Sequence, residues 1–159
     1  MFTETHCKCV SVMLIAMNEQ LPPTLATIVE DFSFAEGREK LELLLEYSQT
    51  MPPLPEYLRD HQHMDQVQEC MSPVFVHADK IDGVMKFYFD VPEESPTVRG
   101  FASLMAQGLN GATPEQVLKV PGEFYREMGL QDVLTSQRMN GIRAILAYMK
   151  RLASKELSN

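Results

Sequence analysis

The chain has few cysteines and no long apolar run, and each shortage excludes a class of protein. Three cysteines in 159 residues are an odd number, too few for the disulfide framework of a small secreted domain. The most apolar run covers only residues 10–17, against the roughly 20 residues that a membrane-spanning helix needs. One lysine precedes this run and no small-residue cleavage pattern follows it, so a signal peptide is a poor fit. We expect a cytoplasmic chain without a membrane segment.

Basic side chains and cofactor motifs are also scarce. The 14 Lys and Arg residues face 22 Asp and Glu, which gives a net charge of -8 at neutral pH and argues against nucleic acid as a partner. Glycine-rich phosphate loops, HExxH helices and paired CxxC motifs are missing, so we expect no cofactor. The length and the 45% of hydrophobic residues are those of one globular domain.

Apolar spacing and turn residues predict an α+β fold. The strand-like runs begin near Met64 and cover residues 74–78 and 84–89, and Asp82-Gly83 is a hairpin signal, so we expect about three antiparallel strands. Capping boxes are predicted at Ser33 with Glu36 and at Thr113 with Gln116. We expect a first helix at residues 21–31 and a second one that contains Leu41–Ser48. Further helices are expected at residues 97–109, 114–120, 123–128 and 136–155.

Cys70 is the candidate for chemistry, because a cysteine in a turn between strands can be reached by another molecule. The alternative is a small buried hydrophobic residue, since free cysteine is among the most buried residue types. The neighbouring Glu69 and Asp65, if close, would raise the pKa of the thiol. No histidine near it in sequence has the pattern of a cysteine hydrolase, although His61, His63 and His77 remain able to approach it in space.

The N-terminal segment carries a second group of soft ligands. His6, Cys7 and Cys9 are one ligand short of a closed zinc site, so we expect no metal there and no role for these cysteines. An N-terminal metal site stays open as an alternative. Met64 and Met71 bracket the Cys70 turn, where thioether side chains suit an adaptable contact surface.

Residues 21–153 resemble, in order and over nearly the full length, the SufE family of sulfur acceptors. The motifs that carry the resemblance are residues 67–75 around Cys70, residues 98–100, and residues 134–141. The resemblance implies a SufE/IscU-like fold with helices packed on one side of the sheet. It divides the chain into one domain, residues 21–155, and an extension, residues 1–20, of uncertain order.

The resemblance also implies a function. Cys70 would take a sulfane sulfur from the persulfide of a SufS-like, pyridoxal-phosphate-dependent cysteine desulfurase, stimulate that enzyme, and pass the sulfur to an iron-sulfur scaffold complex. In the family the cysteine loop is sheltered in the free protein and extends into the desulfurase. Arg138 matches an arginine before the last helix, and Arg99 the basic position of a Val-basic-Gly motif. Either supports the loop or contacts a partner, unless it forms only a surface ion pair worth under about 1 kcal/mol.

Two departures from the family pattern concern the loop. Glu69 stands where many members have glycine, and Pro73 fixes its own φ and restricts Ser72. We expect a stiffer loop that hinges before the cysteine, and the choice of desulfurase stays open. The alternative function is a regulatory module that binds a desulfurase or a cluster scaffold without carrying sulfur.

Overall fold

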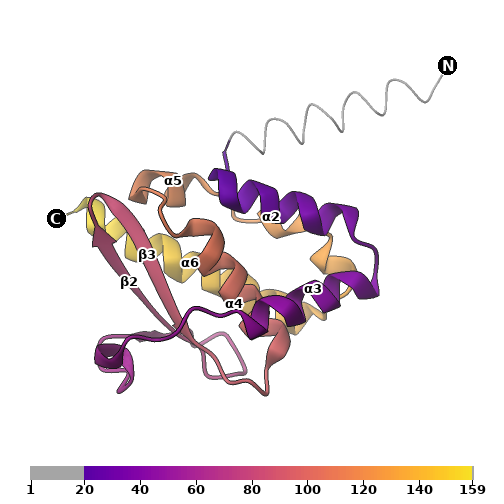
Figure 1. The fold of residues 1–159 in the computed structure, drawn as a ribbon, viewed down its shortest axis with the longest axis horizontal. Helices are drawn as coiled ribbons and strands as arrows, with labels where there is room; N and C mark the ends of the chain where they lie inside the picture. Colours follow the sequence, from indigo (N-terminus) through magenta and orange to yellow (C-terminus); the bar gives the residue numbers. More distant parts are fainter. Residues whose placement is uncertain (1–19, 159) are drawn as a thin grey trace.

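The structure is a computed structural model that describes residues 20–158, and its fold is α+β (Figure 1). The three strands form one antiparallel sheet in the order β1-β2-β3: β1 (Asp65–Gln66), β2 (Phe75–Ile81) and β3 (Val84–Asp90). The α-helices are α2 (Pro23–Phe34), α3 (Arg38–Gln49), α4 (Pro96–Leu109), α5 (Pro114–Lys119) and α6 (Ser136–Leu157). Short 3-10 turns occur at Glu56–Leu58, Phe124–Arg126 and Leu130–Asp132. The predicted α+β class and three-stranded sheet are confirmed.

The β2–β3 hairpin is built as its turn residues predict. Asp82 and Gly83 have φ angles of 52° and 82°, so both central residues of the two-residue turn are left-handed. The register pairs Ile81 with Val84 and continues to Phe75 opposite Asp90. β1 has only two residues, which pair with the start of β2, so the third strand of the sheet is very short where the chain enters the Cys70 loop.

The helices lie on one face of the sheet, as expected. α4 packs against β3 and α6 against β2, and the buried side chains Val76, Phe87 and Phe89 join the same core cluster as these helices (Figure 1). The opposite face is covered by the segment between α3 and β1, where Leu58 and Met64 pack on Tyr88. No helix within residues 20–158 combines the length and the apolar character needed to cross a bilayer.

α4 is the central helix, and two glycines let its neighbours approach closely. A Cβ atom at Gly100 would lie 2.0 Å from the carbonyl oxygen of Leu44 in α3. One at Gly108 would lie 2.9 Å from Cδ1 of Leu25 in α2. Both glycines are therefore required by helix packing and not by a turn.

The predicted capping boxes have different outcomes. The Thr113 hydroxyl oxygen accepts a hydrogen bond from the Gln116 backbone N–H, and the side-chain oxygen of Gln116 accepts one from the Thr113 backbone N–H, so this box is confirmed. The box at Ser33 is wrong: Ser33 lies in the last turn of α2 and its hydroxyl donates to the carbonyl oxygen of Glu30. The next helix starts later, after Gly37, so no Ser33 cap is available to it.

Two further boundaries differ from the sequence expectations. Thr135, one residue before Ser136, is the N-cap of α6, and its side chain accepts from the Arg138 backbone. The helix expected at residues 123–128 is only the 3-10 turn Phe124–Arg126, since Gly129 with φ 71° ends it within one turn. His6, Cys7 and Cys9, the alternative metal ligands, lie outside the described residues.

Candidate functional site

Cys70 lies in the short loop that joins β1 to β2. The buried residues Val67 and Val74 close this loop, since the Val67 N–H donates to the Val74 carbonyl at 2.8 Å. Inside it, the Cys70 N–H donates to the Val67 carbonyl at 3.3 Å, which makes a turn just before the cysteine. The loop thus has fixed ends, and Cys70 lies in a turn between two strands, as the sequence predicts for this cysteine.

The Cys70 thiol is half-buried against α6 and has a weak acceptor. Its Sγ donates to the carbonyl oxygen of Gly141 over 3.7 Å. A Cβ atom at position 141 would lie 3.0 Å from this sulfur, so the glycine leaves room for the thiol. Burial, with a smaller contribution from the charge of Glu69, raises the pKa of Cys70 to about 11. At neutral pH the sheltered thiol is protonated.

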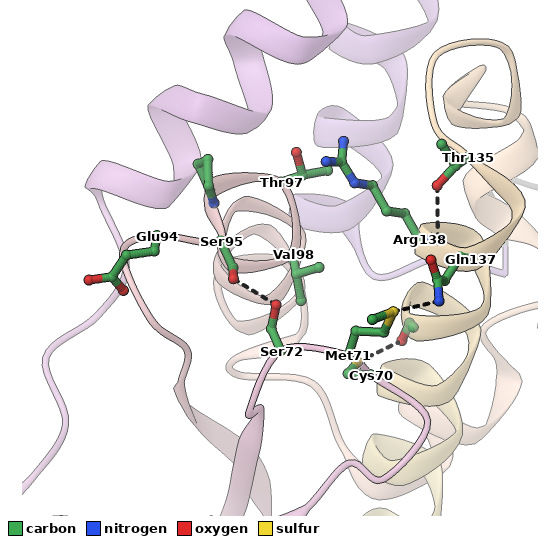
Figure 2. Close-up of a pocket in the computed structure, with 12 residues that line it drawn as sticks. Cys70, Met71, Ser72, Glu94, Ser95, Thr97, Val98, Thr135, Gln137 and Arg138 are labelled. Carbon is green, nitrogen blue, oxygen red and sulfur yellow. Dashed lines mark hydrogen bonds between the residues drawn. The ribbon is translucent and has the colours of Figure 1, made fainter.

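A pocket of about 440 Å³ lies beside the thiol, between the Cys70 loop and the first turns of α4 and α6 (Figure 2). The pocket is lined mainly by polar side chains with a few apolar ones: Cys70, Met71, Ser72, Glu94, Ser95, Pro96, Thr97, Val98, Thr135, Gln137, Arg138 and Gly141. Polar and apolar groups therefore surround the sulfur together.

Besides the contact of Cys70 with Gly141, two side-chain contacts hold the loop to its neighbours. The hydroxyls of Ser72 and Ser95 are 2.6 Å apart, which joins the loop to the N-cap of α4. The side-chain amide of Gln137, in the first turn of α6, donates to Sδ of Met71 (Figure 2). Backbone pairing holds the ends of the loop, whereas its centre is held through side chains.

Arg138 lines the pocket and Arg99 does not. The Arg138 side chain is exposed, and the salt bridges among the described residues do not involve it. The Arg99 guanidinium donates to the Ser48 carbonyl at 2.9 Å and the Val91 carbonyl at 2.5 Å. Arg99 therefore ties α4 to the end of α3 and to the residue after β3, and within residues 20–158 neither arginine forms the surface ion pair considered above.

His61, His63 and His77 lie away from Cys70, on the outer face of the sheet. His77 contacts Asp79 at 2.9 Å and the His63 carbonyl at 2.7 Å, and His61 contacts Asp90 at 2.6 Å. None of these three histidines lines the pocket, so none of them is placed to act as a base for the thiol. In the part of the chain that the structure describes, no three metal-ligating side chains are grouped to hold an ion.

Sequence reasoning missed part of the pocket. Glu94, Ser95 and Thr97 were not singled out, because a Ser-Pro pair before a helix indicates only a helix start. Gln137 and Gly141 belong to the 134–141 motif, but the motif gives no sign that one contacts Met71 and the other Cys70. The sequence therefore showed that these two residues belong to a motif, but not which residues they contact in the fold.

Comparisons with known proteins agree on one family. The SufE family profile, described as an Fe-S metabolism associated domain, matches residues 26–153. An uncharacterised SufE-like protein of Mycobacterium tuberculosis is 42% identical over 132 residues, which cover 82% of this chain and 92% of the relative. A protein of Plasmodium vivax named cysteine desulfuration protein SufE is 27% identical over 144 residues, or 87% of this chain and 56% of that protein.

A solved structure has the same fold. The solution structure of a hypothetical protein from Thermus thermophilus is similar with a TM-score of 0.78 and 39% sequence identity. The similarity covers 87% of this chain and 99% of that one. The arrangement of strands and helices described above is therefore found in a second protein.

Proposed function

The chain belongs to the SufE family of Fe-S metabolism associated domains, and from this membership we propose that Cys70 accepts sulfur from a cysteine desulfurase. The loaded protein then passes the sulfur to an iron-sulfur scaffold complex in a reducing cytoplasm. The observation that carries the proposal is a cysteine in an anchored loop, with a pocket beside its sulfur. The name of the Plasmodium vivax relative supports the same chemistry.

The proposed step is a thiol-persulfide exchange. The Cys70 thiolate attacks the outer sulfur of the donor persulfide, a new S–S bond forms on Cys70, and the donor's S–S bond breaks. The donor cysteine leaves as a thiolate, and the proton of the Cys70 thiol is released in the exchange. No net oxidation occurs, because one persulfide replaces another.

In the free protein the Cys70 thiol is sheltered and is not arranged to attack a persulfide. A half-buried thiol whose pKa is raised to about 11 is a poor nucleophile at neutral pH, since the thiolate is the reactive form. We infer that the centre of the loop leaves the pocket when a desulfurase binds, which exposes Cys70 and lowers its pKa. This movement must break the Ser72–Ser95 and Met71–Gln137 contacts and the weak hydrogen bond from Cys70 to the Gly141 carbonyl.

Arg138 and Met71 are the proposed contacts for the desulfurase. Both side chains are exposed at the mouth of the pocket, next to the path that Cys70 takes on leaving it. Arg99 is assigned a structural role instead, because its Nε and Nη1 atoms donate to the backbone carbonyls of Ser48 and Val91.

The test is a sulfur-loading experiment. The full chain is mixed with a pyridoxal-phosphate-dependent cysteine desulfurase and L-cysteine, and its intact mass is measured. We expect one added sulfur atom that persists in a Cys7→Ser/Cys9→Ser variant and disappears in Cys70→Ser. Absence of sulfur on Cys70 contradicts the proposal.

The second candidate function, a regulator that carries no sulfur, makes a different prediction. The protonated, half-buried thiol favours it, because such a group is not prepared to react in the free protein. Under this reading Cys70→Ser keeps most of the stimulation of the desulfurase. Measured with that variant, cysteine turnover by the desulfurase decides between the two functions.

A further inference from the structure

The methionines of this protein differ sharply in exposure. Eight of the eleven lie in the described residues, and Met71 is 78% exposed whereas Met51 is only partly exposed. The other six are buried: Met64, Met85, Met105, Met128, Met139 and Met149. Because oxidation of methionine follows exposure, Met71 is the thioether of this set that a soluble oxidant reaches first.

Met71 also occupies a special position in the chain. It follows Cys70 directly, and its sulfur accepts the side-chain amide of Gln137 from α6 (Figure 2). A thioether sulfur is a weak hydrogen-bond acceptor. The hydrogen bond between Met71 and Gln137 is therefore weak. A better acceptor in place of the thioether sulfur would strengthen it without any other change in the protein.

We propose that Met71 is a site of reversible oxidation by peroxides, and that its sulfoxide holds the Cys70 loop more firmly on α6 through Gln137. In the reaction the thioether sulfur attacks one oxygen of hydrogen peroxide, an S–O bond forms and the O–O bond breaks. The sulfur is oxidised by two electrons, the second oxygen of the peroxide leaves as hydroxide, and this hydroxide takes the proton of the transferred oxygen to become water. The new sulfoxide oxygen is a polar acceptor within reach of the same amide donor.

The consequence for sulfur transfer rests on the function proposed above. A firmer loop opens less often, so an oxidised protein loads sulfur more slowly while its thiol stays sheltered. Cys70 itself is half-buried and donates to the Gly141 carbonyl, which makes it a slower target for peroxide than its exposed neighbour. Oxidation at Met71 thus protects the thiol from the irreversible acids that peroxide forms on exposed thiolates.

The first measurement locates the modification. The full chain is treated with hydrogen peroxide, quenched with catalase and reduced with dithiothreitol, which reverses disulfides but leaves methionine sulfoxide in place. Among the eight described methionines, peptide mass spectrometry should find the first added oxygen on Met71. A Met71→Leu variant should lose this oxygen and a Met51→Leu variant should keep it. First oxidation at any other of these eight methionines overturns the proposal.

The second measurement tests the effect on the loop. Amide hydrogen exchange of residues 68–72 should slow roughly two- to tenfold in the oxidised protein, the effect expected when a weak hydrogen bond is replaced by one of ordinary strength. Methionine sulfoxide reductase should restore the original rate. Gln137→Ala should remove the slowing, and Gln131→Ala, an exposed glutamine remote from the loop, should not. Unchanged or faster exchange after oxidation at Met71 overturns the proposal.

The third measurement separates this inference from the proposed function. Sulfur loading of each variant is compared before and after peroxide, and oxidised wild type should load more slowly than its own untreated form. If untreated protein gains no sulfur on Cys70, the proposed function fails, and the oxidation map and exchange rates still decide the role of Met71. If untreated protein loads normally and oxidised protein loads at the same rate, the inference fails alone.

Discussion

Helix α4 meets two neighbours in different ways. Against α3 it makes backbone contact, with Gly100 pressed on the Leu44 carbonyl and Arg99 bound to the Ser48 carbonyl. Against the Cys70 loop, its N-cap makes a single hydroxyl pair, Ser72 with Ser95. The first contact cannot open without unfolding the helix pair, whereas the second opens by rotation of two side chains. The comparison teaches that the loop can move while the helices around it stay in place.

The largest effect should come from Gly100→Ala. The added Cβ would lie 2.0 Å from a backbone oxygen, and overpacking of this kind costs about 3 kcal/mol of unfolding free energy. Urea denaturation measures the loss. Gly122→Ala is the matched control, since nothing lies within 4 Å of a Cβ there, and it should change stability little. Equal stability of the two variants would mean that α3 and α4 do not pack as closely as described.

Substitution of Arg99 should lower the stability of the fold, whereas substitution of Arg138 should slow sulfur loading. Arg99→Ala leaves two carbonyl acceptors without their charged donor and should cost about 2 kcal/mol. Arg138→Ala, at an exposed position, should stay within about 0.5 kcal/mol of the wild type but slow sulfur loading. Chemical denaturation and the loading assay give the two readouts. A stability loss in Arg138→Ala as large as that in Arg99→Ala would erase the distinction.

The pH dependence of Cys70 reactivity should reveal the sheltered thiol. Because its folded-state pKa is raised to about 11, the native state keeps its proton above the ordinary cysteine pKa of about 8.5. The stability contributed by the sheltered thiol is complete below that ordinary value and is lost as the pH rises through the folded-state value.

Alkylation of Cys70 by iodoacetamide in a Cys7→Ser/Cys9→Ser background should therefore rise with a midpoint above that of unfolded protein. Glu69→Gln should lower the midpoint by less than unfolding does, since burial is the larger cause of the shift. A midpoint equal to that of the unfolded chain would show that the thiol is not sheltered.

The smallest effect should come from Ser95→Ala. Removal of one hydroxyl partner weakens the loop contact by at most about 1 kcal/mol, so alkylation of Cys70 should quicken by a factor below about ten with global stability nearly unchanged. Ser33→Ala, which removes a hydroxyl bound only to the Glu30 carbonyl, is the control and should have no effect on Cys70. Equal alkylation rates in the two variants would mean that the hydroxyl pair does not restrain the loop.

Local signals in the sequence predicted the elements that local contacts build. Asp82-Gly83 sets its own turn, and Thr113 and Gln116 cap each other, so neither needs the rest of the chain. The Ser33 box failed because α2 runs on to Phe34 and uses the Ser33 hydroxyl inside its last turn. The spacing of the residues was right, but the end of the previous helix decides whether a serine is free to cap.

The site was predicted only in part, for a similar reason. Cys70 was found through its turn and the motif around it, both of which are contiguous in sequence. The role of Arg99 depends on the Ser48 carbonyl, 51 positions away, and a backbone carbonyl leaves no trace in the residue pattern. The sequence does not reveal the pairing of Ser72 with Ser95 either, because a hydroxyl both donates and accepts hydrogen bonds and so can pair with many kinds of group.

The hydrogen bond that closes the loop sets a limit on reach. Cys70 is the third residue after Val67, and three extended residues span about 10 Å at most. While the Val67–Val74 pair stays formed, the Cα atom of Cys70 therefore stays within about 10 Å of that of Val67, and the thiol reaches beyond it only by the length of its own side chain. Under the proposed function, a desulfurase must bring its reacting sulfur to the end of this short tether, so the Val67–Val74 hydrogen bond limits how deeply that partner can bury the sulfur atom to be transferred.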